Sequence, residues 1–528
     1  MPIPAEHILA IDLGTSSLKL ALVSVRGVVA DSEVEPLEIS LLADGGVEQD
    51  PEHWWAAIRR GTHRMLDRGS VPVERIVGLN LSSQWSGTVP VDRAGRHLTN
   101  AIIWMDSRGA DHVKAVTDGF PRLQGYGVAK LAKWIRLTGG VPGHSGKDPI
   151  AHILWIRAER PDVYRETATF LEPRDYLNLR FTGKVASSFD AITLHWVTDN
   201  RDLGRVDYNA GLLRMAQLER GKLPDLLPPA SVLGPILPDV ARDLGLSDRV
   251  QVVIGMPDVL AASIGSGAVR DFDAHLCIGT SSWLTCHVPY KKSDLFHNMA
   301  SLPSSIPGRY LLTNEQESAG ICLTWLRDNV FFHDDELAAS ADRLDAYRIF
   351  DKIAERAPAG SDGVIFTPWL NGERTPVDDH RVRGGFFNQS LDTTRAHLVR
   401  AVLEGVAYNS RWLLTYVERF IKRRLPEVTM IGGGARSNLW CQIHADVLGR
   451  PIRQAEEPVL ANARGAAFQA AAALGYLSFD EIPEHVPIAR TFEPEPDNRG
   501  IYDALYGHFT DMYRSTKHLH AKLNGASR

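Results

Sequence analysis

The chain has 528 residues, more than one hydrophobic core usually serves, and its 44% hydrophobic and 23% charged residues are typical of a folded globular protein. Its 58 Lys and Arg residues against 64 Asp and Glu give a net charge of −6, so we expect no nucleic-acid partner. The N-terminus lacks the cationic segment of a signal peptide, and no stretch is long and apolar enough to span a membrane. Four widely separated cysteines form no Cys-x-x-Cys pair. These features predict a cytoplasmic protein with no membrane partner, no disulfide scaffold and no structural zinc.

Short apolar strands alternate with amphipathic helices along the chain, which is typical of an α/β fold. The polar, proline-rich segment 480–498 is expected to be a surface connection ahead of a last helix. In chain order, the pattern predicts a strand at 8–11, a helix at 51–66, a strand at 76–81, helices at 148–159 and 175–181, strands at 250–254 and 310–313, a helix at 395–423, a strand at 428–431, and helices at 438–448, 461–474 and 501–523.

A repeated segment divides the chain nearly in half. Residues 11–23 and 276–288 each combine a short apolar strand, a Gly-Thr-Ser-Ser turn and a second apolar strand. Each copy predicts a β-hairpin whose tip exposes small residues and backbone N–H groups. Gly-Thr-Ser-Ser is also ordinary turn chemistry, but the matching strands on both sides favour two similar lobes with a cleft between them.

The first hairpin tip has a composition suited to phosphate binding. Consecutive N–H groups beginning at Gly14 can bind phosphate oxygens, and Asp12 lies two residues before that glycine. A carboxylate beside a phosphate site is well placed to hold Mg²⁺ through water. The alternative is that Asp12 only caps the turn.

Asp258 is the candidate general base. It follows a Gly-Met-Pro turn, begins a helix of small residues, and lies between the two halves of the chain. An N-cap role is the simpler interpretation. The functional interpretation is that Asp258 is a general base, because phosphoryl transfer requires little from a protein beyond a base, a metal and hydrogen-bond donors.

Two glycine-containing turns resemble nucleotide motifs. Gly146-Lys147 looks like the end of a P-loop, but Asp148 replaces the required Ser or Thr. The Gly432–Gly434 turn follows a strand and opens a helix, with Ser437 where a dinucleotide fingerprint has its third glycine. This turn could therefore bind a dinucleotide, allow the base or sugar of another nucleotide to approach the backbone, or serve helix–strand packing alone.

Polar and aromatic residues cluster at two further positions. One is the segment 83–87, and the other combines Trp104, Asp106 and Arg108 after a strand. Aromatic faces and fork-shaped polar groups suit the faces and hydroxyls of a polyol. Ordinary loops at strand ends are the alternative.

Together these motifs resemble the FGGY family of carbohydrate kinases, and xylulose kinases among them, over practically the whole chain. The residues that carry the resemblance are Asp12-x-Gly14-Thr15-x-Ser17-x-Lys19, Val47-Glu-Gln-Asp-Pro51, Trp104-x-Asp106-x-Arg108, Phe170-Leu-x-Pro-Arg-Asp175, Gly255-x-x-Asp258, Gly279-Thr280-Ser281, Phe366-x-Pro-x-Leu-Asn371-Gly-Glu-Arg-Thr-Pro376, Arg383-Gly384, Glu404-Gly-Val-Ala407, Gly432-Gly-Gly-Ala-x-Ser437 and Ala463-x-Gly465-Ala466-Ala467.

The resemblance implies an α/β fold of two actin-like (ribonuclease H-like) lobes with the active site in the cleft, a sugar-binding lobe at 1–262 and a nucleotide-binding lobe at 263–528. It implies ATP- and Mg²⁺-dependent phosphorylation of a sugar hydroxyl, with Asp258 as the base and Asp12 as the metal ligand, and such kinases are frequently homodimers. ATP would be bound by Gly14, Thr15, Ser16, Lys19, Gly279, Thr280, Ser281, Gly432, Gly433, Gly434 and Asn438, and the sugar by Gln84, Trp85, Ser86, Trp104, Asp106, Arg108 and Asp258.

Several residues of this chain differ from those usual in xylulose kinases, and these differences concern the sugar site. Trp85 and Ser86 stand where xylulose kinases usually have Met-His, Val259 replaces a polar residue after the base, and His152 replaces a usual Lys. A more apolar pocket favours a smaller, deoxy or modified ketose or polyol, and the Arg-Glu pair typical of glycerol kinases is absent. The preferred substrate is a ketopentose such as xylulose or a related polyol, with ribulose, an erythritol-type polyol or gluconate as alternatives. A dormant nucleotide- and sugar-binding sensor, or a nicotinamide-dependent dehydrogenase built on the Gly432 turn, would be a different class of protein.

Overall fold

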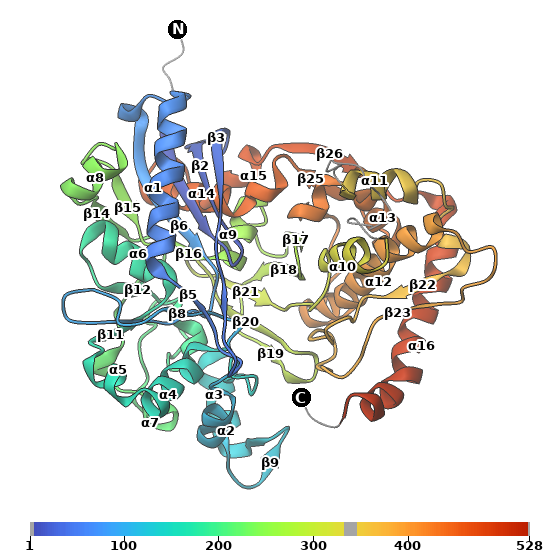
Figure 1. Cartoon of the computed structure of the whole chain (residues 1–528), viewed down its shortest axis with the longest axis horizontal. Coiled ribbons are helices and arrows are strands. Elements are labelled where there is room, and N and C mark those ends of the chain that lie inside the picture. The colour runs from blue at the N-terminus through green and yellow to red at the C-terminus, as the bar shows by residue number, and fades with distance from the viewer. Residues whose placement is uncertain (1–4, 332–345, 526–528) are drawn as a thin grey trace.

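The computed structural model describes residues 5–331 and 346–525 and contains two large mixed β-sheets, one from each half of the chain (Figure 1). The first sheet has the order β14-β15-β6-β1-β2-β3, and β16 also pairs with β6. Its strands are β1 (His7–Leu13), β2 (Ser17–Ser24), β3 (Val29–Pro36), β6 (Ile76–Ser83), β14 (Val232–Pro235), β15 (Gln251–Val253) and β16 (Met256–Pro257).

The second sheet has the order β19-β20-β21-β18-β17-β24-β25-β26. Its strands are β17 (Ala274–Ile278), β18 (Ser282–Val288), β19 (Ser293–Asp294), β20 (Met299–Pro303), β21 (Tyr310–Thr313), β24 (Val428–Ile431), β25 (Ile452–Ala455) and β26 (Ile488–Phe492). Smaller sheets are formed by β4 (Ser40–Leu41), β5 (Val47–Gln49) and β8 (Ala101–Ile102), by β7 (Val89–Val91) and β11 (Thr169–Leu171), by β9 (Arg122–Leu123) and β10 (Tyr126–Gly127), by β12 (Ala186–Ser188) and β13 (Asp225–Leu227), and by β22 (Ile365–Thr367) and β23 (Gly385–Phe387).

The two large sheets share one pattern of connections. In the first, β1 is antiparallel to β2 and parallel to β6, and β15 continues the parallel set. In the second, β17 is antiparallel to β18 and parallel to β24, and β25 continues the parallel set. This correspondence confirms the predicted pair of hairpins and the two-lobed α/β fold.

The helices confirm the predicted ones with small shifts at their ends. The first long helix, α1, begins where the Asp50 side chain accepts the N–H of Glu52, and it ends at Gly69 in the left-handed conformation. The α-helices are α1 (Pro51–Arg68), α2 (Ala110–Thr117), α3 (Val128–Thr138), α4 (Pro149–Glu159), α5 (Pro161–Glu166), α6 (Pro173–Thr182), α7 (Ala210–Ala216), α8 (Pro238–Leu244), α9 (Asp258–Gly265), α10 (Ile321–Asn329), α11 (Ala346–Ala354), α12 (Arg395–Ile421), α13 (Asn438–Leu448), α14 (Ala461–Ala473), α15 (Ile482–His485) and α16 (Arg499–Leu523).

The segment 480–498 is more ordered than the predicted surface connection. It contains α15 and also β26, which pairs antiparallel with β25 at the end of the second sheet. Only Phe492 of the five residues of β26 is buried. An edge strand needs a partner on one side only, so this strand has the polar composition of a loop.

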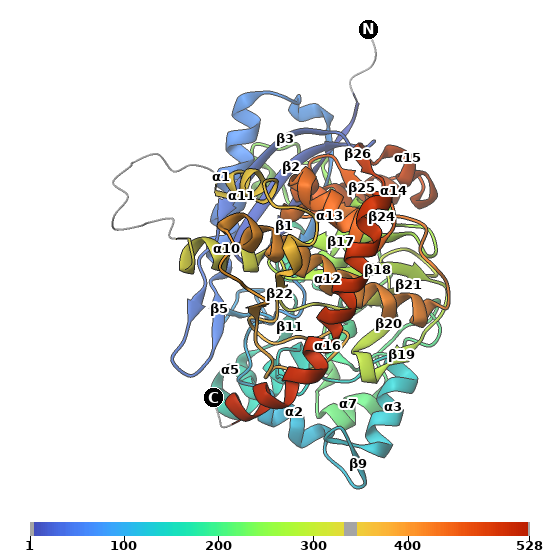
Figure 2. The same cartoon turned by 90° about the vertical axis from the view of Figure 1, so that its right-hand side faces the viewer.

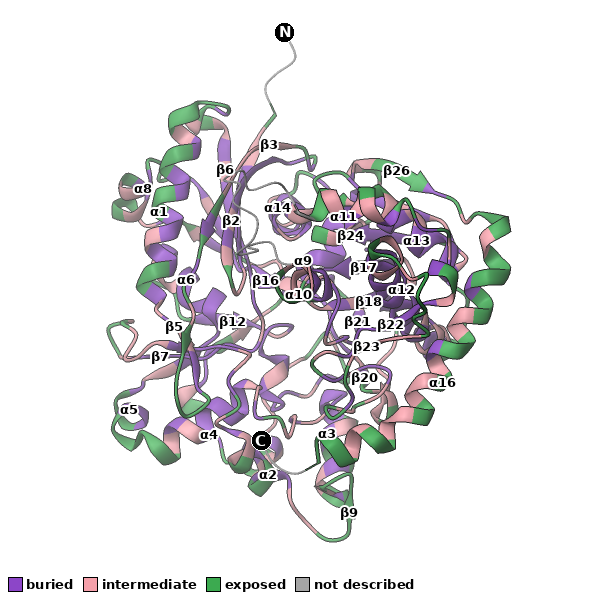
Figure 3. Cartoon of the chain, turned by 45° about the vertical axis from the view of Figure 1, so that its right-hand side comes forward, coloured by how far each residue is buried: buried purple, intermediate pink, exposed green. Residues whose placement is uncertain are grey.

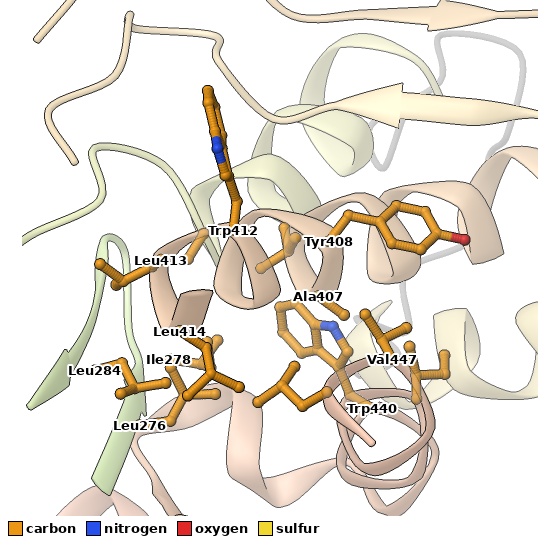
Figure 4. Packing of buried hydrophobic residues seen from close by; sticks show 14 of the residues in the cluster. Leu276, Ile278, Leu284, Ala407, Tyr408, Trp412, Leu413, Leu414, Trp440 and Val447 are labelled. Carbon is orange, nitrogen blue, oxygen red and sulfur yellow. The ribbon is translucent and has the colours of Figure 1, made fainter. Parts of the chain in front are cut away.

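The largest core lies where α12 and α13 pack on the second sheet (Figure 4). Leu276 and Ile278 of β17 lie beside Leu414 of α12 there, and Ala407 of α12 lies beside the Trp440 indole of α13. That indole donates a hydrogen bond of 2.9 Å to the carbonyl of Leu403. The long helices α1 and α16 expose one side to solvent (Figure 3). Burial of one helix face against a sheet supplies most of the stability of such layers.

Helices α9 and α14 cross closely between the two sheets. A Cβ on Gly265 would collide with the backbone of Ala461, and one on Gly465 would collide with the backbone of Ala261. Although α14 comes from the second half of the chain, it packs on β1, β2 and β6 of the first sheet (Figure 1). Helix α16, from the same half, runs along the side of the molecule that faces the viewer in Figure 2. The two halves are therefore interlocked at this crossing. Among the described residues, no helix has the length and apolar character required to cross a bilayer.

Candidate active site

Asp12 lies at the end of β1, where three other elements bring hydrogen-bond donors to its buried carboxylate. The register of the sheet places Lys19 of β2 and Ser82 of β6 beside it. Lys19 Nζ lies 3.0 Å from Oδ2, and Ser82 Oγ donates to Oδ1 at 3.0 Å. Asn462 of α14 also donates to Oδ1, at 3.3 Å. The negative charge of Asp12 is the main reason that the pKa of Lys19 is raised, so this lysine is a firmly charged ammonium.

Asp258 is the first residue of α9, and the short strand β16 that precedes it pairs with β6. Pro257 occupies the N-cap position, so Asp258 is not the N-cap. Its Oδ1 accepts the N–H of Val259 at 2.9 Å, and within the described residues Oδ2 has no recorded partner. Burial and then the negative charge of Asp12 raise the pKa of Asp258 to about 7. A carboxylate with that pKa and a free oxygen can accept a proton near neutral pH.

The first hairpin tip is tied to the candidate sugar residues. The N–H of Gly14 bonds to the carbonyl of Ser17 at 3.0 Å, and Ser16 is exposed. The Trp104 indole donates to Thr15 Oγ1 at 2.9 Å, and the Gln84 carboxamide lies 3.5 Å from the same hydroxyl. The structure therefore brings Thr15, Gln84 and Trp104 together.

The second hairpin tip is fixed by the segment that enters α10. The N–H groups of Ala319 and Gly320 donate to the carbonyls of Thr280 and Gly279 at 2.9 and 2.8 Å. Thr280 is exposed and Ser281 is half-buried. The tip thus presents its outer side to solvent while its inner side is held by the protein.

The Gly432–Gly434 turn lies against this second tip. Gly432 has a φ of +86°, and a Cβ there would be 2.6 Å from the carbonyl oxygen of Ile278, the residue before Gly279. A Cβ on Gly434 would collide with the Ile278 side chain, whereas Gly433 faces open space. Ser437 caps α13 by accepting the N–H of Trp440 at 3.0 Å. Glycine is thus required for close approach of two backbones, and Asn438 follows, exposed, at the start of α13.

Asp106 and Arg108 are occupied by each other and by their surroundings. The Asp106 carboxylate accepts the N–H groups of Val47 and Arg108 at 2.9 Å each, and also the Arg108 Nε. The Arg108 guanidinium also contacts Glu48 at 2.7 Å and lies 3.9 Å from the centre of the Trp155 ring. These contacts fix the loop that carries Trp104.

Trp85 and Ser86 lie in the segment that follows β6, directly after Gln84. The Trp85 indole donates to the carbonyl of Ala191 at 2.8 Å, so its nitrogen is already satisfied. Ser86 is buried and has a φ of +65°, a conformation that costs a non-glycine residue free energy.

Sequence reasoning assigned no role to Arg374, although the Asn371–Pro376 motif was recognised. Arg374 forms ion pairs with Glu315 and Glu317, and its guanidinium lies 6.0 Å from the centre of the Trp104 ring. The charge of Glu315 also contributes to the raised pKa of Asp258. This cluster joins the second half of the chain to the site, and its members are too far apart in sequence for any local pattern to connect them. Asn462 was missed for the same reason.

No group of three or more His, Cys, Asp or Glu side chains arranged to hold a metal occurs in the described part of the chain. A magnesium ion bound mainly by substrate phosphates needs only one or two carboxylates, so this finding is compatible with Asp12 as a ligand.

Comparisons with known proteins match both halves of the chain. The N-terminal domain of the FGGY family of carbohydrate kinases matches residues 7–265, and the C-terminal domain of that family matches residues 274–474. The xylulose kinase of Escherichia coli is 30% identical over 96% of this chain and 98% of its own length. The gluconokinase of Bacillus subtilis is 25% identical and covers 98% of each chain. A xylulose kinase structure from Lactobacillus acidophilus superposes with a TM-score of 0.84 at 23% identity, over 98% of this chain and 100% of that one.

Proposed function

Because the chain belongs to the FGGY family of carbohydrate kinases, we propose that it transfers the γ-phosphoryl group of ATP to a hydroxyl of a ketopentose such as xylulose, or of a related polyol. The chain is a carbohydrate kinase with ATP and a sugar as its substrates. The observation that carries the proposal is the juxtaposition of Asp12, Lys19 and Asp258 at the end of the first sheet.

Asp258 would accept the proton of the attacking sugar hydroxyl. Its free Oδ2 and its pKa of about 7 support this role, because a base is most effective when its pKa lies near the working pH. Removing that proton as the hydroxyl oxygen attacks the γ-phosphorus leaves the sugar phosphate and ADP as products.

Asp12 would hold Mg²⁺, which neutralises charge on the ATP phosphates when it is bound. Its buried carboxylate and its position beside the hairpin tip support this assignment. Lys19 would balance the charge of Asp12, and Ser82 and Asn462 would orient the carboxylate. The N–H groups at the two tips would bind phosphate oxygens, and the Gly432–Gly434 turn with Asn438 would face the adenosine.

The two alternatives from other classes have less support. The full-length relatives are named as kinases, and both Asp12 and Asp258 are present, so nothing favours a dormant sensor. A dehydrogenase would need the Gly432 turn as a dinucleotide site, but Ser437 is used as a helix cap. A kinase for gluconate keeps specific support, because gluconokinases are among the relatives.

A panel assay tests the proposal. Purified protein with ATP and Mg²⁺ is supplied separately with pentuloses, hexuloses, pentitols, tetritols, glycerol and gluconate, and ADP release is recorded together with the mass of the product. We expect one strong response, from a ketopentose or a close relative of it, and no response to glycerol. ATP binding without sugar-dependent ADP release for any member of the panel would contradict the proposal. Light scattering of the same sample tests the predicted homodimer.

A further inference from the structure

The loop between α3 and α4 holds Lys147 in a fixed position. His144 stacks on Tyr126 with ring centres 3.8 Å apart, and the Asp148 carboxylate accepts the Gly143 N–H at 2.7 Å. Gly146 has a φ of +77° and lies too close to the backbone of Ala110 to carry a Cβ. Because the residues on both sides of Lys147 are anchored, its side chain starts from a rigid base.

The Lys147 ammonium lies over the indole of Trp104, 5.6 Å from the centre of the ring. Among the residues that the structure describes, no oxygen is recorded as a hydrogen-bond or ion-pair partner of this ammonium. The Arg374 guanidinium, which comes from the second half of the chain, lies near the same ring, but it is already paired with Glu315 and Glu317. Lys147 is therefore the cation at this ring that keeps its donors free.

A half-buried ammonium without an oxygen partner is costly for the protein. Burial and then the charge of Arg374 lower the pKa of Lys147, and the smaller opposing effects of Glu317 and Glu315 do not reverse this shift. An ammonium has three donors and no acceptor, so it is best matched by an oxygen that only accepts hydrogen bonds.

The position of this ammonium relates it to the reacting groups. The Trp104 ring beneath it donates through its nitrogen to Thr15 at the first hairpin tip. Arg374, which lies near the same ring, is paired with Glu315, and the charge of Glu315 contributes to the raised pKa of Asp258. A sugar held against the face of Trp104 would therefore lie beside the Lys147 ammonium.

We propose that Lys147 is a specificity-determining residue that binds an oxygen of the sugar able only to accept hydrogen bonds, above the face of Trp104. The inference rests on the proposed sugar kinase function. In open-chain sugars, two kinds of oxygen have this chemistry, the carbonyl oxygen of a ketose and the carboxylate of a sugar acid. A polyol has neither, because each of its hydroxyls is also a donor.

The test compares D-xylulose, D-gluconate and xylitol with the wild-type protein and the Lys147→Met, Lys147→Arg and Lys114→Met variants. KM is measured for each sugar that is phosphorylated, and the inhibition constant for each that is not. Lys114 is the matched control, because it is an exposed lysine whose recorded ion-pair partner within the described residues is Asp111, at 3.1 Å. We expect Lys147→Met to weaken binding of the preferred sugar by roughly tenfold to a hundredfold, the usual effect of losing a hydrogen bond to a charged group.

Binding of xylitol should change by less than about threefold, the KM for ATP should be unchanged, and Lys147→Arg should restore part of the loss. A loss confined to xylulose assigns the oxygen to the keto group, and a loss confined to gluconate assigns it to the carboxylate. Equal losses for all three sugars, or no loss, would overturn the inference. If the wild-type protein phosphorylates none of them, the proposed function fails separately, and calorimetric binding of the same sugars to the wild-type and Lys147→Met proteins still decides the role of Lys147.

Discussion

The two hairpin tips have the same backbone frame but different chemistry. In the first, Asp12 is paired across the hairpin with Lys19, and the charges of both residues affect the pKa of Asp258. In the second, the residue two before the glycine is Cys277, and it is paired with Trp283. Burial raises the pKa of the Cys277 thiol, so that position carries no charge near neutral pH. The first tip thus concentrates charge, whereas the second offers only neutral groups.

The tips also differ in size. Leu13 pairs with Leu18 at the first tip, but Ile278 pairs with Ser282 at the second, so the second connection is one residue shorter. The Gly432–Gly434 turn packs directly against the end of β17 beside this tighter tip. A repeated fold thus supplies two similar backbone frames, and the different residues on these frames separate the reacting end of the site from the proposed nucleotide end.

Outside Asp258, we expect the largest effect at Asp12. Asp12→Asn removes the charge proposed to hold Mg²⁺ and should lower kcat/KM by at least about a hundredfold, with a weaker dependence on Mg²⁺ concentration. The corresponding change on the other tip, Cys277→Ala, should alter kcat/KM by less than about threefold. Steady-state kinetics at several Mg²⁺ concentrations measure both, and equal losses at the two tips would contradict the separation.

Gly432 and Gly433 form a matched pair for stability at the second tip. Gly432→Ala places a Cβ 2.6 Å from the Ile278 carbonyl at a φ of +86°, and it should lower the free energy of unfolding by about 2–3 kcal/mol. Gly433→Ala faces open space and should change it by less than about 0.5 kcal/mol. Denaturant unfolding measures both variants. A Gly432→Ala protein as stable as the wild type would show that the close approach is not needed.

The pH dependence of turnover should report Asp258. Its deprotonated form is the base, so kcat/KM should rise with pH through a limb near the pKa of about 7. The negative charge of Glu315 raises that pKa, so Glu315→Gln should move the limb to lower pH. The control is Glu159→Gln, an exposed residue at the end of α4, which should leave the limb in place. A limb that does not move in Glu315→Gln would remove Glu315 from the surroundings of the base.

The sequence predicted the features of this molecule that are local. The hydrophobic pattern identified the longest helices and several strands of both large sheets, and the Gly-Thr-Ser-Ser repeat identified both hairpins, because each depends on residues close together in the chain. Other elements, such as β3, β25 and α3, were not predicted. The edge strand β26 was missed, because four of its five residues are not buried and therefore leave no hydrophobic pattern.

The remaining site residues were missed because tertiary contacts bring them together. Asn462 reaches Asp12 from a helix 450 positions later in the chain, and Arg374 reaches Trp104 from the other half. For Lys147, the sequence excluded a P-loop because Asp148 replaces Ser or Thr, but the position of Lys147 over Trp104 depends on how the loop folds. Residue types alone could not supply these distances.

The most direct test of the proposed role of Asp258 is to measure Mg²⁺–ATP binding and sugar-dependent ADP release on the same preparation of the Asp258→Asn protein. We expect wild-type affinity for the nucleotide, because the tips and the Gly432 turn are untouched. We also expect a loss of turnover of roughly a thousandfold, the usual contribution of a general base. Turnover close to that of the wild-type protein would contradict the assignment of Asp258 as the base, and a large loss of nucleotide affinity would contradict the separation of the reacting end from the nucleotide end.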